Sequence, residues 1–571
     1  MTSLLTQPQL ITTAAGDVEE IRSAIGAAKA AAAGPTTGLV AAAQDEVSAA
    51  TAKLFGAYAQ EYQSVLARAG VFHEEFAAAL GSAGNAYAAA EAANASAISG
   101  AAPAVVQPTL QGTIIGLFMG GSGLPIPPPS YITATLNYVT QHFDVLPANA
   151  QALFTPEGYY PIIIKSLPLD VSISQGVQIL DSAIKQQLAA NPTGSVAVLG
   201  YSQSAVISSL EMENLAKMSS GAPTANQLGF TLLGDLMAPN GGIMARFPGF
   251  PAGQPLQTPS LGFTFYGATP SNTIYPTNIY TLEYDGYADF PQYPINFISD
   301  LNAVAGIAFV HGTYPNINPS TLPPGDLILL PGSTANPAPG GVAATNTNYY
   351  MITTTNLPLL DPVRAIPVIG NPIADLVQPD LTTIVNLGYG NPNFGWSQGP
   401  ANVTTQFGLF PHVSHALVAQ DLITGAQQGA HAFVSDMSAE ASGMSLSSLS
   451  HSLTSMAGTG AAHLSALSSP DSIIETIQGA VTNAANRISG TAARLYAAAL
   501  PTADILNTVV TVFPAYDVNL FLSGIQQAID GNLVGGLQYA LIAPIAADTG
   551  LLTFAGGIEL EVLLGALGVS L

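Results

Sequence analysis

The sequence contains no cysteine, and this absence removes several kinds of site at once. A chain without thiols forms no disulfide, no zinc–thiolate centre and no cysteine nucleophile. Basic residues are also scarce, with 11 Lys and Arg against 35 Asp and Glu, so the formal net charge is −24. Because this excess of negative charge repels a phosphate backbone, we expect no nucleic-acid partner.

The shortage of positive charge is most pronounced in the middle of the chain, where no Lys or Arg occurs between Arg246 and Arg364. Carboxylates in this span must therefore be solvated, hydrogen-bonded or paired with histidine. A basic segment is also missing from the first residues, "MTSLLTQPQLITTAAGDVEE", and their apolar run is too short for a secretory signal peptide. We expect that export, if it occurs, uses another route.

The sequence is rich in apolar residues, which make up 48% of its 571 positions. This content is enough to form the hydrophobic cores of several domains. Shifts in composition and periodicity predict a multidomain chain with an α/β domain at its centre. The predicted parts are a helical hairpin at 1–100, a linker at 101–112, an α/β domain with a mostly parallel sheet at 113–400, a helical extension at 401–436, a Ser/Ala/Gly-rich linker at 437–470 and an apolar, mainly helical region at 471–571.

Helical periodicity dominates the first hundred residues. Apolar residues recur every three or four positions from Leu54 to Tyr87, which predicts one long helix with a single apolar stripe. A shorter helix from about Gln9 to Ala33 is expected to fold back on it. Because two helices bury only one seam, we expect this hairpin to pair with further helices from a partner.

The C-terminal tail is hydrophobic, but acidic residues interrupt it. Asp548, Glu559 and Glu561 fall within "LVGGLQYALIAPIAADTGLLTFAGGIELEVLLGALGVSL". These interruptions argue against a segment that crosses a membrane. We favour packed helices, and association with the surface of a lipid layer is the alternative.

The central span alternates apolar strand candidates with helical runs, which indicates a mostly parallel sheet. The strand candidates are "TIIGLFMGGSG", "YYPIIIK", "SVAVLGYSQS", "QLGFTLLGDLMAP", "TNIYTLEYDGYADFP" and "DLILLPG". In "SVAVLGYSQSAVISSL", a buried strand stops at a small polar turn and a helical pattern follows. A strand, a sharp turn and a helix with serine at the tip predict a nucleophile elbow at Ser202. The alternative is an ordinary turn with a capping serine.

A serine nucleophile needs a base and an orienting acid, and the order in α/β hydrolases is Ser, Asp, His. Asp285 and Asp289 both follow a predicted strand, and we favour Asp289 because its segment resembles the Gly-x-x-Asp turn of many α/β hydrolases. Asp285 is the alternative acid. A non-catalytic aspartate at either position would accept a hydrogen bond from the backbone of the turn. His311 is the predicted base. His412 and His415 are the alternative bases, but they lie after the end of the predicted domain. No carboxylate accompanies them at ligand spacing, so we expect neither a metal nor a cofactor.

Donors for a developing oxyanion are expected from the loop after the first strand and from the residue after the nucleophile. Gly121 and Ser122 occupy that loop, and Gln203 follows Ser202. A phosphate-binding glycine loop is the alternative, but no Lys follows it.

Two stretches resemble known families. The stretch "VSAATAKLFGAYAQEYQSVLARAGVFHEEFAAALGSAGNAYAAAEAANAS" resembles the PE domain of the mycobacterial PE family, although Pro8-Gln9 stands where that family has Pro-Glu. Residues 113–393 resemble the PE-PPE domain, an α/β-hydrolase-like fold similar to cutinases. The PE resemblance implies a PPE-family partner for the hairpin and type VII secretion, with Tyr87 and Glu91 matching its Tyr-x-x-x-Asp/Glu export motif. The PE-PPE resemblance implies a serine esterase in which the Ser122 hydroxyl supports the oxyanion.

These patterns together predict an exported serine hydrolase of the esterase or lipase type, acting on apolar acyl esters at the cell surface or cell envelope. One alternative is an acyltransferase that uses the same triad on cell-envelope lipids. The other is a surface or interaction protein with a relict hydrolase domain.

Overall fold

The structure is a computed structural model. It describes residues 107–443 apart from 252 and 339–345, residues 470–567, and scattered positions between 23 and 63. Most of the predicted hairpin, the export motif at Tyr87 and Glu91, and most of the Ser/Ala/Gly-rich linker lie outside the described residues.

The chain forms two compact units. The first comprises residues 1–104 and 518–544, and the second comprises residues 105–517 and 545–571. In the first unit, helical residues are described at 29–35 and 52–57. Its C-terminal part contains the end of helix α12 (Pro470–Ile529) and the start of α13 (Leu533–Leu567). Gly524 and Gly536 leave no room there for a side chain, because a Cβ on either would meet the backbone of the facing helix.

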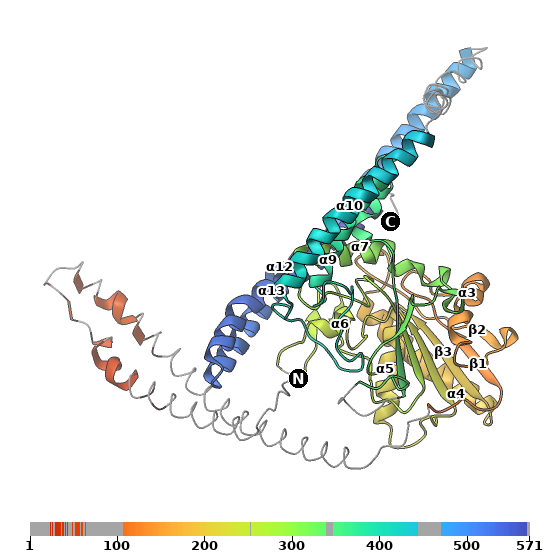
Figure 1. The fold of residues 1–571 in the computed structure, drawn as a ribbon. Helices are drawn as coiled ribbons and strands as arrows, with labels where there is room; N and C mark the ends of the chain where they lie inside the picture. The colour runs from red at the N-terminus through yellow and green to blue at the C-terminus, as the bar shows by residue number, and fades with distance from the viewer. Residues whose placement is uncertain are drawn as a thin grey trace. The chain divides into compact units, whose positions relative to one another are not determined.

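The second unit is built on a seven-stranded sheet with the order β2-β1-β3-β4-β7-β9-β8 (Figure 1). Every neighbouring pair is parallel except β8 and β9. This arrangement confirms the predicted fold class. The strands are β1 (Ile114–Phe118), β2 (Ala150–Ala152), β3 (Ser195–Tyr201), β4 (Leu228–Leu233), β7 (Thr277–Leu282), β8 (Leu327–Leu329) and β9 (Thr347–Ile352), and β5 (Leu256–Thr258) and β6 (Phe263–Phe265) form a separate antiparallel pair.

Helices connect the strands of the sheet. α4 and α5 pack against each other and against β3, and Gly176 of α4 provides the space that the Ile207 side chain of α5 occupies. The helices are α3 (Pro129–Val139), α4 (Leu169–Ala190), α5 (Gln203–Lys217), α6 (Ile243–Arg246), α7 (Phe297–Phe309), α8 (Asp361–Arg364), α9 (Gly370–Leu387) and α10 (His415–Gly443), with short 3₁₀ turns η1 (Pro147–Asn149), η2 (His311–Asn316), η3 (Pro319–Thr321) and η4 (Pro358–Leu360).

A hydrophobic core lies between the sheet and the segments α3 and η2. Phe118, Leu199 and Leu282, each at most 1% exposed, pack there with Tyr138 and Tyr314. The buried strands show no polar alternation because protein covers both faces of the sheet. This core holds the carboxyl ends of β3 and β7 in fixed positions beside η2.

One predicted strand is wrong. Residues 159–165, "YYPIIIK", form turns and not a strand. Ile162 and Ile163 do not join the sheet; their apolar side chains line a cavity that is described below. β9, which completes the parallel part of the sheet, is not among the predicted strands.

The C-terminal region is helical, as predicted. By length and composition alone, two described segments are candidates for crossing a membrane, Ala497–Ile529 and Leu533–Leu567, although acidic residues interrupt both. Within the second unit, Leu551, Phe554 and Val562 of α13 are nevertheless at most 5% exposed. This end of α13 packs against protein through a buried face.

Candidate active site

Ser202 stands at the tip of the turn between β3 and α5. Its backbone has φ 57° and ψ −120°, a strained conformation for a residue with a side chain. Gly200 is required before it, because a Cβ there would lie 2.5 Å from the Ser204 carbonyl oxygen. The structure thus gives Ser202 the sharp strand-to-helix turn that the sequence predicted.

Ser204 stands where the usual Gly-x-Ser-x-Gly pattern has its second glycine. Its hydroxyl accepts a hydrogen bond from the Tyr201 N–H at 2.8 Å, and it is fully buried. The hydroxyl satisfies a backbone donor inside the turn, so the departure from glycine fits this elbow.

His311 contacts both Ser202 and an aspartate. Its Nε2 lies 2.8 Å from Ser202 Oγ, and its Nδ1 lies 2.8 and 2.9 Å from the two carboxyl oxygens of Asp285. His311 begins η2, immediately after α7. Gly234, at the end of β4, leaves space for the ring, because a Cβ there would lie 2.9 Å from His311 Cε1.

The acid beside His311 is Asp285, and the preference for Asp289 is wrong. Asp285 follows β7 and is fully buried at the sheet's carboxyl edge, where it also accepts hydrogen bonds from the Tyr314 hydroxyl (2.8 Å) and the Tyr287 N–H (3.1 Å). Asp289 lies one turn further along, and its N–H donates to the Asp285 carbonyl. That turn carries its side chain away from His311.

Asp289 has a different environment. Its Oδ2 accepts from the Tyr284 N–H at 3.1 Å, and its Oδ1 has no hydrogen-bond partner among the described residues. Burial raises the pKa of Asp289 well above its usual value, although the nearby Arg246 guanidinium opposes this. Arg246 is itself fully buried and donates to the carbonyls of Phe290 and Thr405. Asp289 therefore belongs to a buried structural cluster.

Two tyrosines that the sequence analysis did not single out hold the histidine and the acid in place. The Tyr201 hydroxyl donates to the His311 carbonyl oxygen at 2.6 Å, and its ring stacks on the imidazole at 5.5 Å between centroids. Tyr314 donates to Asp285 and accepts from the Leu282 N–H at 2.9 Å. Burial and the Asp285 charge raise the pKa of Tyr314, so its hydroxyl stays protonated and remains a donor.

The predicted oxyanion residues gather around the nucleophile. A Cβ on Gly121 would lie 3.1 Å from Ser202 Cβ, which shows how closely this loop approaches the serine. Ser122 donates to the side-chain oxygen of Gln203 at 2.9 Å. The N–H of Gln203 is the first of α5, where backbone donors have no partner within the helix. These groups are placed to receive a negatively charged oxygen beside Ser202.

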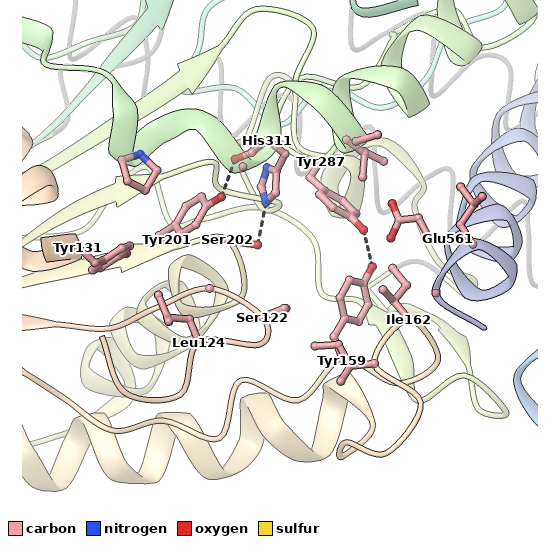
Figure 2. Close-up of a pocket in the computed structure, with 18 residues that line it drawn as sticks. Ser122, Leu124, Tyr131, Tyr159, Ile162, Tyr201, Ser202, Tyr287, His311 and Glu561 are labelled. Carbon is pink, nitrogen blue, oxygen red and sulfur yellow. Dashed lines mark hydrogen bonds between the residues drawn. The ribbon is translucent and has the colours of Figure 1, made fainter. Parts of the chain in front are cut away.

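Ser202 and His311 open into a cavity of about 590 Å³ (Figure 2). Its wall comes from the loops after β1 and β3, from the 159–163 turn, from α7 and η2, and from α13. Most of the lining is aliphatic or aromatic. The lining residues include Leu124, Tyr131, Tyr159, Ile162, Ile163, Tyr201, Tyr287, Ile307, Pro315, Glu561 and Leu564.

Glu561 of α13 is an acidic group in this cavity (Figure 2). Burial raises its pKa to about 7, and His311 opposes the shift. The hydroxyls of Tyr159 and Tyr287 lie 2.8 Å apart beside it. Sequence reasoning noted Glu561 only as an interruption of an apolar tail, because its approach to the triad depends on how α13 packs.

Among the described residues, no group of three or more His, Asp or Glu side chains is placed to hold a metal ion. His412 and His415 do not line the cavity.

Comparison with known proteins finds two family matches in this chain. Residues 4–94 match the PE family, and residues 147–390 match the PE-PPE domain. The chain is 42% identical to "Esterase PE16" of Mycobacterium tuberculosis over 414 residues, which cover 72% of this chain and 73% of that protein. It is 48% identical to "Uncharacterized PPE family protein PPE28" of the same organism over 458 residues, which cover 79% of this chain and 65%, just under two thirds, of that protein.

Among solved structures, a cutinase-like protein from Cryptococcus sp. aligns with a TM-score of 0.22 and 17% identity, covering 32% of this chain and 82% of that one. The matched PE-PPE segment contains Ser202, Asp285 and His311. The chain therefore belongs to the PE family and carries an esterase-like PE-PPE domain.

Proposed function

We propose that this protein is a serine esterase that cleaves apolar acyl esters with Ser202 as nucleophile, His311 as base and Asp285 as orienting acid. The observation that carries the proposal is the continuous contact from Ser202 Oγ to His311 Nε2 and from His311 Nδ1 to Asp285. Each step is at hydrogen-bond distance without any rearrangement.

The geometry supports a two-step acyl transfer. His311 Nε2 accepts the Ser202 proton while Oγ attacks the acyl carbonyl carbon, and Asp285 stabilises the resulting imidazolium. The Gln203 N–H donates to the oxyanion, and the Ser122 hydroxyl adds a second donor when it turns from the Gln203 side-chain oxygen to which it donates in the free enzyme. His311 then gives its proton to the departing alcohol, which leaves an acyl-Ser202. A water then loses its proton to His311 and attacks the acyl carbon; the acyl–Oγ bond breaks, His311 returns the proton to Ser202 Oγ, and a carboxylic acid is released.

The cavity favours a neutral, apolar ester. The described residues that line it include no Lys or Arg to bind a phosphate or carboxylate, while Leu124, Ile162 and Ile163 offer aliphatic contacts. A largely apolar pocket with a few polar groups at one point is typical of ester-binding sites. The similarity to a protein named as an esterase also supports this reaction class.

We further propose that the protein is exported by type VII secretion to the cell surface or envelope, and that its N-terminal hairpin pairs with a PPE-family protein. The match of residues 4–94 to the PE family supports both points. The Tyr87 and Glu91 spacing supplies the proposed export motif.

Labelling with a fluorophosphonate probe tests the activity. The wild-type chain should form an adduct and hydrolyse p-nitrophenyl esters, and Ser202→Ala should do neither while melting at nearly the same temperature. Removal of a triad nucleophile leaves only weak residual catalysis from the oxyanion donors and binding. Absence of an adduct on folded wild-type protein, or full activity in Ser202→Ala, would refute the proposal.

A further inference from the structure

We propose that α13 forms the alcohol-binding wall of the cavity, and that Glu561 selects esters whose alcohol carries additional hydroxyl groups, such as acyl esters of glycerol or sugars. The inference rests on the esterase activity proposed above and specifies its substrate class. Neither the PE match at 4–94 nor the PE-PPE match at 147–390 includes this helix.

The wall is a fixed part of the second unit. Ile558 and Val562 of α13, on either side of Glu561 in sequence, are at most 5% exposed. Phe554 packs edge-on against Tyr287 at 6.1 Å and against Phe263 at 6.0 Å between ring centroids. These contacts anchor α13 next to the triad, since Tyr287 also packs edge-on against the His311 ring at 4.8 Å.

The cavity has two chemically different arms, one on each side of Ser202 (Figure 2). In the first arm, the hydroxyls of Tyr131 and Tyr201 are already used, because they donate to backbone carbonyls at 2.9 and 2.6 Å. Those two residues therefore present only ring carbon to a substrate, and Leu124 extends the same surface. This arm suits the acyl chain.

The second arm contains Glu561 with Tyr159 and Tyr287 (Figure 2). The two tyrosine hydroxyls bond each other, but no described residue donates a hydrogen bond to the Glu561 carboxyl, and no Lys or Arg lines the cavity. A partly buried carboxylate without a donor is unfavourable, and a hydroxyl group supplied by a ligand would relieve that cost.

His311 lies where the two arms meet, between Tyr201 and Tyr287. Because His311 donates its proton to the leaving alcohol, the alcohol part of the ester must lie beside it when the acyl–oxygen bond breaks. The arm with the free carboxylate is the polar one, so it suits the alcohol part. An anionic head group is disfavoured there, because ionised Glu561 repels it and no Lys or Arg among the described lining residues compensates.

A matched pair of esters tests the selectivity. Propyl decanoate and monodecanoylglycerol have the same acyl chain and three alcohol carbons, and they differ by two hydroxyl groups. Wild-type protein should prefer the glycerol ester in kcat/KM, and Glu561→Leu should lower that value about tenfold or more, mainly through KM, without lowering it for the propyl ester. Glu561→Gln, which keeps the shape and an acceptor oxygen, should lie between the two.

Glu559→Gln is the charge-matched control on the same helix. Glu559 accepts from Thr502 at 2.8 Å and does not line the cavity, so the preference should persist in this variant. Thermal melting of all variants reports whether α13 remains docked.

The outcomes separate the two proposals. Ser202-dependent hydrolysis with no glycerol preference, or an equal loss on both esters in folded Glu561→Leu and Glu561→Gln, overturns the role of Glu561 and leaves the esterase intact. A Glu561-dependent preference for decanoylcholine over the glycerol ester would identify a cationic alcohol and also overturn the inference. Failure of folded wild-type protein to cleave either ester overturns the esterase proposal and this inference with it.

Discussion

The two aspartates after β7 allow a direct test of the triad, because they lie four residues apart and have different partners. Asp285→Asn should reduce kcat for ester hydrolysis by about 10⁴, which corresponds to about 5.5 kcal/mol of transition-state stabilisation. Asp289→Asn should leave kcat within a fewfold of wild type, because Asp289 makes no contact with His311 and accepts from the Tyr284 N–H.

The magnitude for Asp285 follows from its hydrogen bonds. Both carboxyl oxygens lie within 2.9 Å of His311 Nδ1. In an asparagine at this position, one oxygen keeps the bond from the Tyr287 N–H, and an amide NH₂ replaces the oxygen that lies 2.8 Å from Nδ1 and accepts from the Tyr314 hydroxyl. The amide donates to Nδ1, so the imidazole proton moves to Nε2. A protonated Nε2 cannot accept the Ser202 proton, and the negative charge that stabilises the imidazolium is also lost.

The assay is steady-state hydrolysis of a p-nitrophenyl ester, together with the rate of fluorophosphonate labelling and thermal melting of both variants. Asp285→Asn should melt near the wild-type temperature but label slowly, while Asp289→Asn should label at nearly the wild-type rate. An inactive but folded Asp289→Asn together with an active Asp285→Asn would refute the triad described here.

Three further predictions concern residues outside the nucleophile and its acid. Tyr314→Phe removes a donor to the buried carboxylate and an acceptor for the Leu282 N–H, so kcat should fall about tenfold with little change in KM; an unchanged kcat would refute this positioning role. Burial raises the pKa of Glu157 from 4.5 to about 8, so its ionisation destabilises the fold progressively as the pH rises from 4.5 to 8. Glu157→Gln should therefore raise the melting temperature at pH 8 and change it little at pH 5 in calorimetry, and an equal shift at both pH values would contradict this. Tyr87→Ala in the full chain should block secretion, measured as protein in culture filtrate against cell lysate; undiminished secretion would remove Tyr87 from the export motif.

Local sequence patterns sufficed for the features that depend on neighbouring residues. The β3 strand, the turn at Ser202 and the α5 helix follow one another within the stretch from 195 to 217. A strand that is buried on both faces consists mostly of apolar residues, and a helix has apolar residues every three or four positions, so both can be predicted from the local sequence. The order of serine, acid and histidine, together with the predicted end of the domain, favoured His311 as the base over His412 and His415.

Tertiary structure decided which groups meet across long distances in sequence. Asp285 and Asp289 both follow the same strand, and only the direction of the intervening turn places one against His311 and the other beside Arg246. The "YYPIIIK" segment has strand-like composition, yet it forms a cavity wall, because residue types alone do not distinguish burial in a sheet from contact with a pocket.

Local sequence also could not predict that Glu561 lies in the active-site cavity, since it follows Ser202 by more than half the length of the chain. The spacing of apolar residues determined that the tail is helical, and periodicity requires only local information. Which acidic residue of that helix reaches the active-site cavity depends on the packing of Phe554 and Val562 against the second unit. That packing arises from contacts distant in sequence, so only the folded structure places a carboxyl group near the triad.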